Sequence, residues 1–199
     1  MAIAVSAAVE GPTDEAVAVR LIEHVGAQPL AVYGKNGKPH LKQHAGAYNH
    51  AARHKPWLLL VDLDRDADCA PPLRHAWLPQ PARLMCFRVA VRAVEAWLLA
   101  DAEAVADFFG VARARVPRDP ETLADPKAAM VNLARASRRR DIREDMVPRA
   151  GSGRAVGPAY SSRVREFVEK HWRPAVAAQR ADSLARAIRC LRQLVERDA

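Results

Sequence analysis

The chain has 199 residues, with 31 Lys and Arg against 23 Asp and Glu, which gives a net charge of +8 when the histidines are neutral. Half of the residues are hydrophobic, enough for one sizeable core. No apolar run approaches the roughly 20 residues of a membrane span, and the three cysteines lack the paired spacing of a disulfide framework or a zinc site. We therefore expect a cytoplasmic protein with no membrane partner.

The first 110 residues alternate between strand-like and helix-like segments. Strands are predicted at 3–9, 29–33, 57–61 and 84–91, and helices at 16–25, 41–54 and 93–109. The third strand is apolar without alternation, which is typical of a strand buried on both faces of a parallel sheet. Four prolines between positions 71 and 81 predict a loop with at most one helical turn there. This order predicts an α/β fold, a mainly parallel, Rossmann-like sheet flanked by helices.

The character of the chain changes after about residue 115, where several prolines interrupt it. We expect an α/β domain at 1–115 and a basic helical annex at 116–199, with helices predicted at 128–137, 160–172 and 183–197. Residues 135–199 carry 16 basic and 8 acidic side chains, whereas residues 1–134 carry 15 of each. The excess positive charge therefore predicts that the annex contacts a polyanion. The alternative is an arginine-rich composition with no partner.

Four carboxylates follow the buried strand at alternate positions: Asp62, Asp64, Asp66 and Asp68. Side chains two apart in a strand project to the same side, so Asp62 and Asp64 would repel each other unless they share a proton or hold a cation. Mg²⁺ prefers such oxygen ligands. An EF-hand loop is excluded, because its glycine and glutamate positions hold Ala67 and Leu73. A solvated acidic turn stays as an alternative.

A second acidic motif, Glu10-Gly11-Pro12-Thr13-Asp14, ends the first predicted strand. If strand one lies beside strand three in a parallel sheet, the carboxyl ends of both strands meet at one edge. A glutamate that faces two aspartates forms a metal site with a candidate general base.

These two motifs and the strand–helix order between them resemble the Toprim domain of topoisomerases, primases, recombination mediators and OLD-type nucleases. The resemblance covers roughly residues 1–110. More narrowly, residues 92–101 and the helix that begins near Ser183 resemble an uncharacterised bacterial Toprim-like family, often encoded beside ATPases in defence-type operons. The chain departs from the Toprim pattern after Asp64, where a glycine is often found and this sequence has Asp66-Ala67-Asp68.

The resemblance implies Mg²⁺- or Mn²⁺-dependent phosphodiester chemistry. Asp62 and Asp64 would be metal ligands, and Glu10 would act as general acid and base or as a further ligand. Asp14 would take the second acidic position seen in the OLD-type nucleases. Glu95 is a further candidate ligand, with a charge at a helix N-terminus as the alternative.

Positive side chains complete the set of candidate site residues. Lys35, Lys38 and Arg92 are candidate phosphate contacts, and a solvated surface is the alternative for the two lysines. Candidate nucleic-acid contacts in the annex are Arg138, Arg139, Arg140 and Arg154.

The function hypothesis is a metal-dependent nuclease or related phosphodiester-processing protein, with DNA favoured over RNA and an ATPase as a possible partner in phage defence. Two alternatives remain open. One is a non-catalytic subunit that binds nucleic acid or a partner protein. The other is a glycosyltransferase whose DxD motif holds Mn²⁺ and a sugar diphosphate, which would leave Glu10 without a role.

Overall fold

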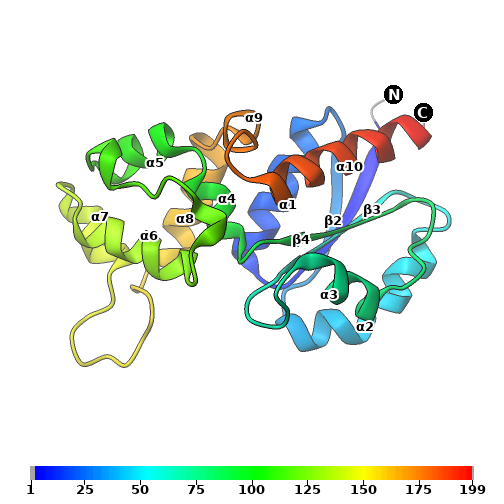
Figure 1. Ribbon diagram of the computed structural model, residues 1–199, viewed down its shortest axis with the longest axis horizontal. Coiled ribbons are helices and arrows are strands. Elements are labelled where there is room, and N and C mark those ends of the chain that lie inside the picture. The colour runs from blue at the N-terminus through cyan, green and yellow to red at the C-terminus, as the bar shows by residue number, and fades with distance from the viewer. Residues whose placement is uncertain (1–2, 199) are drawn as a thin grey trace. The chain divides into compact units, whose positions relative to one another are not determined.

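A computed structural model describes residues 3–198 (Figure 1). The chain forms two compact units, a sheet unit of residues 1–91 and 182–199 and a helical unit of residues 92–181. The elements of the sheet unit are β1 (Ala4–Val9), α1 (Pro12–His24), β2 (Gln28–Gly34), α2 (Lys38–Ala51), β3 (Trp57–Asp62), α3 (Ala70–Trp77), β4 (Met85–Ala90) and α10 (Asp182–Asp198). Among the described residues, no helix is long and apolar enough to cross a membrane.

The four strands form one sheet in the order β2-β1-β3-β4, and every neighbouring pair is parallel. Ala7 pairs with Leu58 across β1 and β3, and Leu58 pairs with Cys86 across β3 and β4. The predicted α/β class with a parallel sheet is therefore confirmed, as is the predicted adjacency of the first and third strands. This adjacency brings the carboxyl ends of β1 and β3 to the same edge of the sheet.

Helices cover both faces of this sheet, as the unbroken apolar pattern of β3 requires. Leu59, Val61 and Phe87 belong to a buried cluster on one face, together with Leu41 of α2 and Leu73 of α3. The helices α1 and α10 lie on the opposite face (Figure 1). Residues that alternate with the first set, including Cys86 and Arg88, consequently face the side of α10.

The segment at residues 71–81, expected to be a loop with at most one helical turn, contains the longer helix α3 of 8 residues. Its prolines occupy the first helical positions, where a backbone N–H has no partner within the helix and the fixed φ of proline is already helical. The same arrangement begins α1 at Pro12 and places Pro39 in the first turn of α2. A proline cluster at this spacing therefore marks a helix start rather than a loop.

The helical unit contains α4 (Val94–Leu99), α5 (Ala102–Phe109), two short 3₁₀ turns at Arg113–Arg115 and Pro120–Thr122, α6 (Pro126–Arg135), α7 (Arg140–Met146), α8 (Tyr160–Lys170) and α9 (Pro174–Ala177). The single helix expected at 93–109 is wrong, because the chain breaks at Asp101. This fully buried carboxylate caps α5 and also binds the Arg173 guanidinium at 2.7 and 2.9 Å. A buried carboxylate needs such a partner. The break between α4 and α5 lets Asp101 both cap α5 and bind Arg173.

The expected boundary near residue 115, with domains at 1–115 and 116–199, is corrected by the structure. The chain leaves the sheet unit after Val91 and returns to it at Asp182. Arg139 donates a hydrogen bond to the Phe108 carbonyl, which ties α5 to the helical unit. The last helix belongs to the sheet unit, where the Val91 N–H donates to the Ser183 hydroxyl.

This division changes the distribution of charge from which we predicted that the annex contacts a polyanion. The helical unit carries 17 basic and 12 acidic residues, so it holds a charge of +5, and the sheet unit holds the remaining +3. The positive charge is less concentrated than the count at residue 135 indicated. Both units are nevertheless basic.

Candidate functional site

Glu10 and Asp62 meet where β1 and β3 end. The Asp62 backbone N–H donates a hydrogen bond of 2.8 Å to Oε1 of Glu10. Glu10 is the first residue after β1, and Asp62 is the last residue of β3. The parallel pairing of the two strands therefore brings together residues that are 52 positions apart in the sequence.

Lys38, the first residue of α2, joins this edge of the sheet to the acidic loop that follows β3. Its ammonium Nζ lies 2.8 Å from Oδ2 of Asp64 and 2.7 Å from Oδ2 of Asp66. The Lys38 side chain is only 16% exposed. Burial lowers the pKa of Lys38, but the hydrogen bonds to Asp64 and Asp66 outweigh it, and the net pKa is raised. The side chain is therefore a cation that two carboxylates hold. We define the carboxylate cluster as Glu10, Asp62, Asp64 and Asp66 together with Lys38.

The loop that carries Lys38 is fixed to the end of β1 by backbone hydrogen bonds. The Lys35 N–H donates to the Val9 carbonyl at 2.9 Å, and the Gly37 N–H donates to the Glu10 carbonyl at 3.0 Å. Gly34 has a φ of +87°, and a Cβ at this position would collide with the Val9 carbonyl oxygen. The glycines of the sequence Gly34-Lys35-Asn36-Gly37-Lys38 therefore allow a close turn that sets α2, and with it Lys38, over Glu10.

Two loops beside the cluster hold unusual backbone conformations. Among the described residues, the only non-glycine residues with a positive φ are Lys35 at 66° and Asp64 at 50°. A left-handed conformation costs a non-glycine residue of order 1–3 kcal/mol, least for Asp and Asn, and such residues concentrate at functional sites. Their position beside the same cluster favours a functional role for this edge of the sheet.

The pKa of Glu10 is raised, and the largest cause is burial, which disfavours the charged carboxylate. The hydrogen bond from Asp62 and the charge of Lys38 lower this pKa, whereas the negative charges of Asp64 and Asp66 raise it further. A carboxylate whose pKa moves toward neutrality is better matched to proton transfer near pH 7. The environment of Glu10 thus fits the general acid and base role.

The donor atoms of the cluster fit a hard divalent cation. Every acidic member offers oxygen, the ligand atom that Mg²⁺ and Mn²⁺ prefer, and Asp64 and Asp66 already converge on a cation, the Lys38 ammonium. No group of three or more His, Cys, Asp or Glu side chains within residues 3–198 is arranged as a ready metal site. Both aspartates are about half exposed, and exposed ion pairs contribute only about 0.2–1 kcal/mol each.

A pocket of about 550 Å³ lies beside the cluster and shares two residues, Lys38 and Asp66, with it. The volume falls in the range typical of small-molecule sites. Apolar side chains form most of its wall, and a second lysine adds positive charge. The lining residues are Lys38, Pro39, Lys42, Asp66, Ala67, Pro72, Leu73, Ala76 and Trp77.

The remaining residues predicted for this edge have other surroundings. Asp14 is nearly buried in the first turn of α1, and its carboxylate lies close to Gly11, where a Cβ would be 3.3 Å from Oδ2. Lys35 forms an ion pair of 3.1 Å with Glu15. Arg92 is the first residue of the helical unit. The predicted metal and phosphate contacts of these three residues stay predictions.

Glu95 is buried inside the helical unit, at the first turn of α4. The Tyr160 hydroxyl donates to Oε1 at 3.2 Å, and the Lys127 ammonium lies 3.5 Å from the same oxygen. The other oxygen, Oε2, is buried and makes no hydrogen bond to any residue that the structure describes. An unpaired buried acceptor costs about 1–3 kcal/mol. The predicted role as a metal ligand stays a prediction, and Oε2 is the atom available for it.

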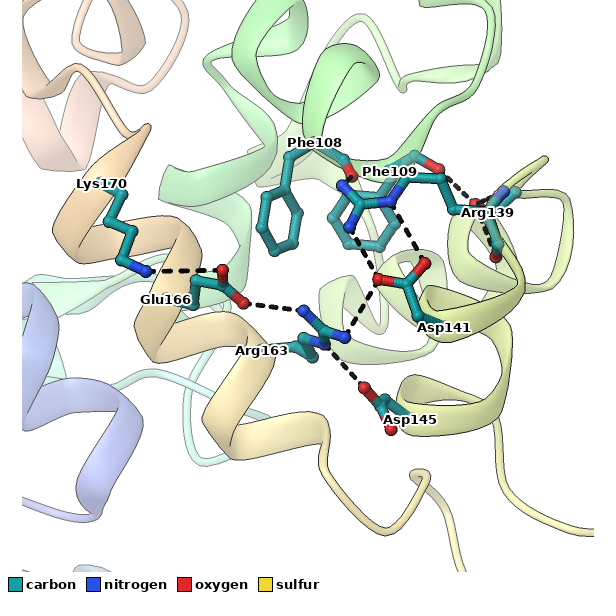
Figure 2. Close-up of polar contacts among 9 residues, drawn as sticks. Phe108, Phe109, Arg139, Asp141, Asp145, Arg163, Glu166 and Lys170 are labelled. Carbon is teal, nitrogen blue, oxygen red and sulfur yellow. Dashed lines mark hydrogen bonds and ion pairs between the residues drawn. The ribbon is translucent and has the colours of Figure 1, made fainter.

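The four arginines predicted to contact nucleic acid differ in their partners. Arg139 binds Asp141 at 2.7 Å and donates to the Phe108 carbonyl at 3.1 Å, so it holds α5 and α7 together (Figure 2). Arg140 pairs with Glu144 at 2.7 Å. Arg138 and Arg154 are exposed, and neither has a carboxylate partner among residues 3–198. Arg138 and Arg154 are therefore better placed to bind phosphates than Arg139 and Arg140.

Sequence reasoning did not include Asp66, Lys42 or Trp77 among the site residues. The alternation of Asp62, Asp64 and Asp66 was a signal for Asp66. Lys42 lies one turn after Lys38 on the same helix, which was a second signal. Trp77 carried none, because the segment around it was expected to be a loop.

No protein-family model matches the chain, and no significant match is found among curated proteins or among solved structures.

We expect Gly34→Ala to destabilise the protein by roughly 1–3 kcal/mol more than Gly26→Ala, because only the former adds a steric collision to the strained backbone. Both glycines have a positive φ, 87° for Gly34 and 79° for Gly26, but a Cβ at Gly26 has no neighbour within 4 Å. Denaturant unfolding of the two variants measures the difference. Equal destabilisation would show that the turn beside Val9 has room for a side chain.

We expect Glu10→Gln to stabilise the protein relative to the parent as pH rises above about 4.5. Because burial raises the pKa of Glu10 above its ordinary value of 4.5, the folded state binds more protons than the unfolded state in this window, and the free energy of unfolding falls with rising pH. Glutamine does not ionise, and its oxygen still accepts from the Asp62 N–H. Unfolding of both proteins across pH 3–9 checks the sign, and a parent that gains stability over the variant with rising pH would refute it.

Proposed function

We propose that the protein is a Mg²⁺- or Mn²⁺-dependent phosphodiester-processing protein of the Toprim type, which acts on nucleic acid. The observation that carries the proposal is the meeting of two acidic strand ends around a bound cation: Glu10 contacts Asp62, and Asp64 and Asp66 hold the Lys38 ammonium. A parallel sheet places its ligands at this edge. Beyond this geometry, the proposal names the metal ion that would bind at the edge, Mg²⁺ or Mn²⁺, and the substrate, nucleic acid.

Asp62, Asp64 and Asp66 are the residues that would hold the metal. When bound, such an ion polarises a phosphoryl oxygen and neutralises charge that develops on it. The ion would take the place of the ammonium, since the carboxylates cannot hold both charges at one point. Because the Lys38 side chain is long and sits at the first position of α2, it remains near the cluster after displacement.

The other residues of the cluster have roles that follow from their charge and surroundings. Glu10, whose pKa burial raises, accepts or returns a proton at its carboxylate. Lys38, once displaced, and Lys42 supply positive charge to a substrate phosphate. The pocket between α2 and α3 offers Trp77 and apolar walls beside these lysines, and an unpaired nucleobase fits that combination, because every base stacks on an aromatic side chain.

The exposed Arg138 and Arg154 extend this proposal to the helical unit, which carries a charge of +5. Arginine pairs bidentately with phosphate, and contacts of this kind are independent of base sequence. DNA is favoured over RNA as the substrate, and an ATPase partner in a defence system belongs to the same proposal. Both follow from the family resemblance alone.

A non-catalytic subunit that binds nucleic acid is the second candidate. The observation that favours it is that Lys38 already neutralises Asp64 and Asp66, while no ready group of three metal ligands exists within residues 3–198. In that case the cluster would be a structural ion pair. The two candidates differ in whether a divalent ion binds and whether phosphodiester bonds are cut.

We expect Mn²⁺ to raise the unfolding temperature of the parent protein and to support cleavage of single- or double-stranded DNA or RNA. Asp64→Asn should lose both effects, because asparagine tolerates the positive φ of this position but lacks the charge. The matched control is Asp68→Asn, an exposed carboxylate of the same loop, which should keep both.

Three results distinguish the candidates. Cleavage by the parent that Asp64→Asn loses supports the proposal. A metal-induced rise in unfolding temperature without cleavage of any substrate supports a metal site but contradicts phosphodiester cleavage. Absence of both effects in the parent supports the non-catalytic subunit and would refute a metal site at this edge.

A further inference from the structure

A second polar cluster lies within the sheet unit, between β4 and α10, and the proposed function makes no use of it. Cys86 of β4 is completely buried, and Cys190 of α10 is partly exposed. The two cysteine side chains are close enough to shift each other's pKa. The guanidinium of Arg88, also on β4, lies near enough to both sulfur atoms to affect them as well. We refer to Cys86, Cys190, Arg88 and Arg74 as the thiol cluster.

The two arginines of the thiol cluster carry positive charge without a carboxylate to balance it. The Nε atoms of Arg74 and Arg88 are both buried and make no hydrogen bond within the described part of the chain. Burial and then the charge of Arg88 lower the pKa of Arg74, so the two guanidinium groups repel each other. Neither forms an ion pair with an Asp or Glu among residues 3–198. Buried charge of this kind requires an anion nearby.

Cys190 supplies that anion. The hydrogen bond from the Cys86 thiol lowers the pKa of Cys190 most, burial opposes it, and Arg88 and Arg74 lower it further, to about 6. A thiol with this pKa is mostly a thiolate at neutral pH, which is the nucleophilic form. Burial and the neighbouring sulfur raise the pKa of Cys86, so Cys86 keeps its proton. The cluster thus pairs one thiolate with one neighbouring thiol.

We propose that Cys190 and Cys86 are a redox-active thiol pair, which a peroxide oxidises to a disulfide that joins α10 to β4. The partly exposed Cys190 is the sulfur that meets the oxidant, and the buried Cys86 is the sulfur that resolves the product. This arrangement, a reactive thiolate beside a resolving thiol, is what distinguishes redox-sensitive cysteines from inert buried ones.

The reaction has two balanced steps. The Cys190 thiolate attacks one oxygen of the peroxide, the O–O bond breaks, and the departing hydroxide or alkoxide takes a proton from water, which leaves a sulfenic acid on Cys190. The Cys86 sulfur then attacks the Cys190 sulfur, the S–O bond breaks, and the leaving hydroxide takes the Cys86 proton to form water. Two electrons pass from the thiols to the peroxide, and a dithiol reductant reverses the change.

The disulfide would change how firmly the last helix is held. Three apolar residues of α10, Leu184, Ile188 and Leu191, are buried, so the helix already packs on the unit that contains β4. A covalent link between positions 86 and 190 would enclose the whole helical unit, residues 92–181, in one loop of the chain. Closing a long loop restricts the unfolded state. We therefore expect the oxidised protein to unfold at a higher temperature.

The first test is to treat the reduced full-length protein with hydrogen peroxide and then map disulfides by mass spectrometry. We expect an intact mass lower by two hydrogens and a peptide that contains Cys86 linked to Cys190, both reversed by dithiothreitol. Cys190→Ser and Cys86→Ser should each abolish the link. The control is Cys69→Ser, which removes the exposed third cysteine and should leave the link unchanged. A parent that forms only Cys69 products, or no intramolecular disulfide, would overturn the proposal.

The second test uses the parent protein, so that it does not depend on how well a variant at the buried Cys86 folds. The rate at which iodoacetamide alkylates Cys190, followed by peptide mapping between pH 4 and 9, should reach half of its maximum near pH 6. Arg88→Met should move that midpoint upward, because it removes a positive charge beside the thiolate. A midpoint above pH 8 in the parent would overturn the proposal. Neither test involves metal or nucleic acid, so each outcome is independent of the proposed function.

Discussion

The position of Glu10 determines how the parts of the carboxylate cluster come together. Its backbone carbonyl accepts from Gly37, immediately before α2, and its side chain accepts from the last residue of β3. One residue therefore joins the ends of two strands and the start of a helix. Each bond contributes only about 0.5–1.5 kcal/mol to stability, but together they fix where Lys38 and Asp62 lie. The rest of the cluster depends on this geometry.

The charges around Glu10 favour a site that binds and releases cations rather than one that serves stability alone. Burial raises the pKa of Glu10, and Asp64 and Asp66 raise it further against the charge of Lys38; the hydrogen bonds to Asp64 and Asp66 raise the pKa of Lys38 against its burial. The ion pairs of Asp64 and Asp66 are half exposed, where salt bridges are weak. By contrast, the fully buried Asp101 of the helical unit accepts hydrogen bonds from Arg173 and is a fixed structural pair.

Much of the sheet unit could be predicted from the sequence. The apolar run at Trp57–Val61 and the acidic residues after it gave both the buried strand and the edge at which the site lies. Glycines at 34 and 37 indicated a loop but not which atoms it would approach, because the close contact with Val9 depends on tertiary packing. The prolines near residue 71 predicted a loop with at most one helical turn and missed the length of α3, since their position in a first helical turn is decided by the backbone that follows.

The domain boundary could not be predicted for a related reason. A composition change near residue 115 is a local signal, whereas the return of α10 to the sheet unit depends on contacts between segments about 100 residues apart, such as those of Val91 with Ser183 and Arg83 with Arg197. The break at Asp101 likewise depends on Arg173. The sequence placed Glu10, Asp62, Asp64 and Lys38 at one edge of the sheet, where the structure brings them together, but it gave no sign that Lys38 would bind the aspartates.

Calorimetric titration of Mn²⁺ into the parent, Lys38→Met and Lys42→Met tests the central claim, that Lys38 occupies the place of a divalent cation among the carboxylates. Lys42 lies one turn further along α2 and serves as the matched control, since it has no ion pair with the aspartates. Removal of a competing charge worth about 1 kcal/mol corresponds to a fivefold change in affinity. We therefore expect Lys38→Met to bind Mn²⁺ at least about fivefold more tightly than the parent and Lys42→Met to bind like the parent. Equal affinities in all three proteins, or no binding in any of them, would contradict the account.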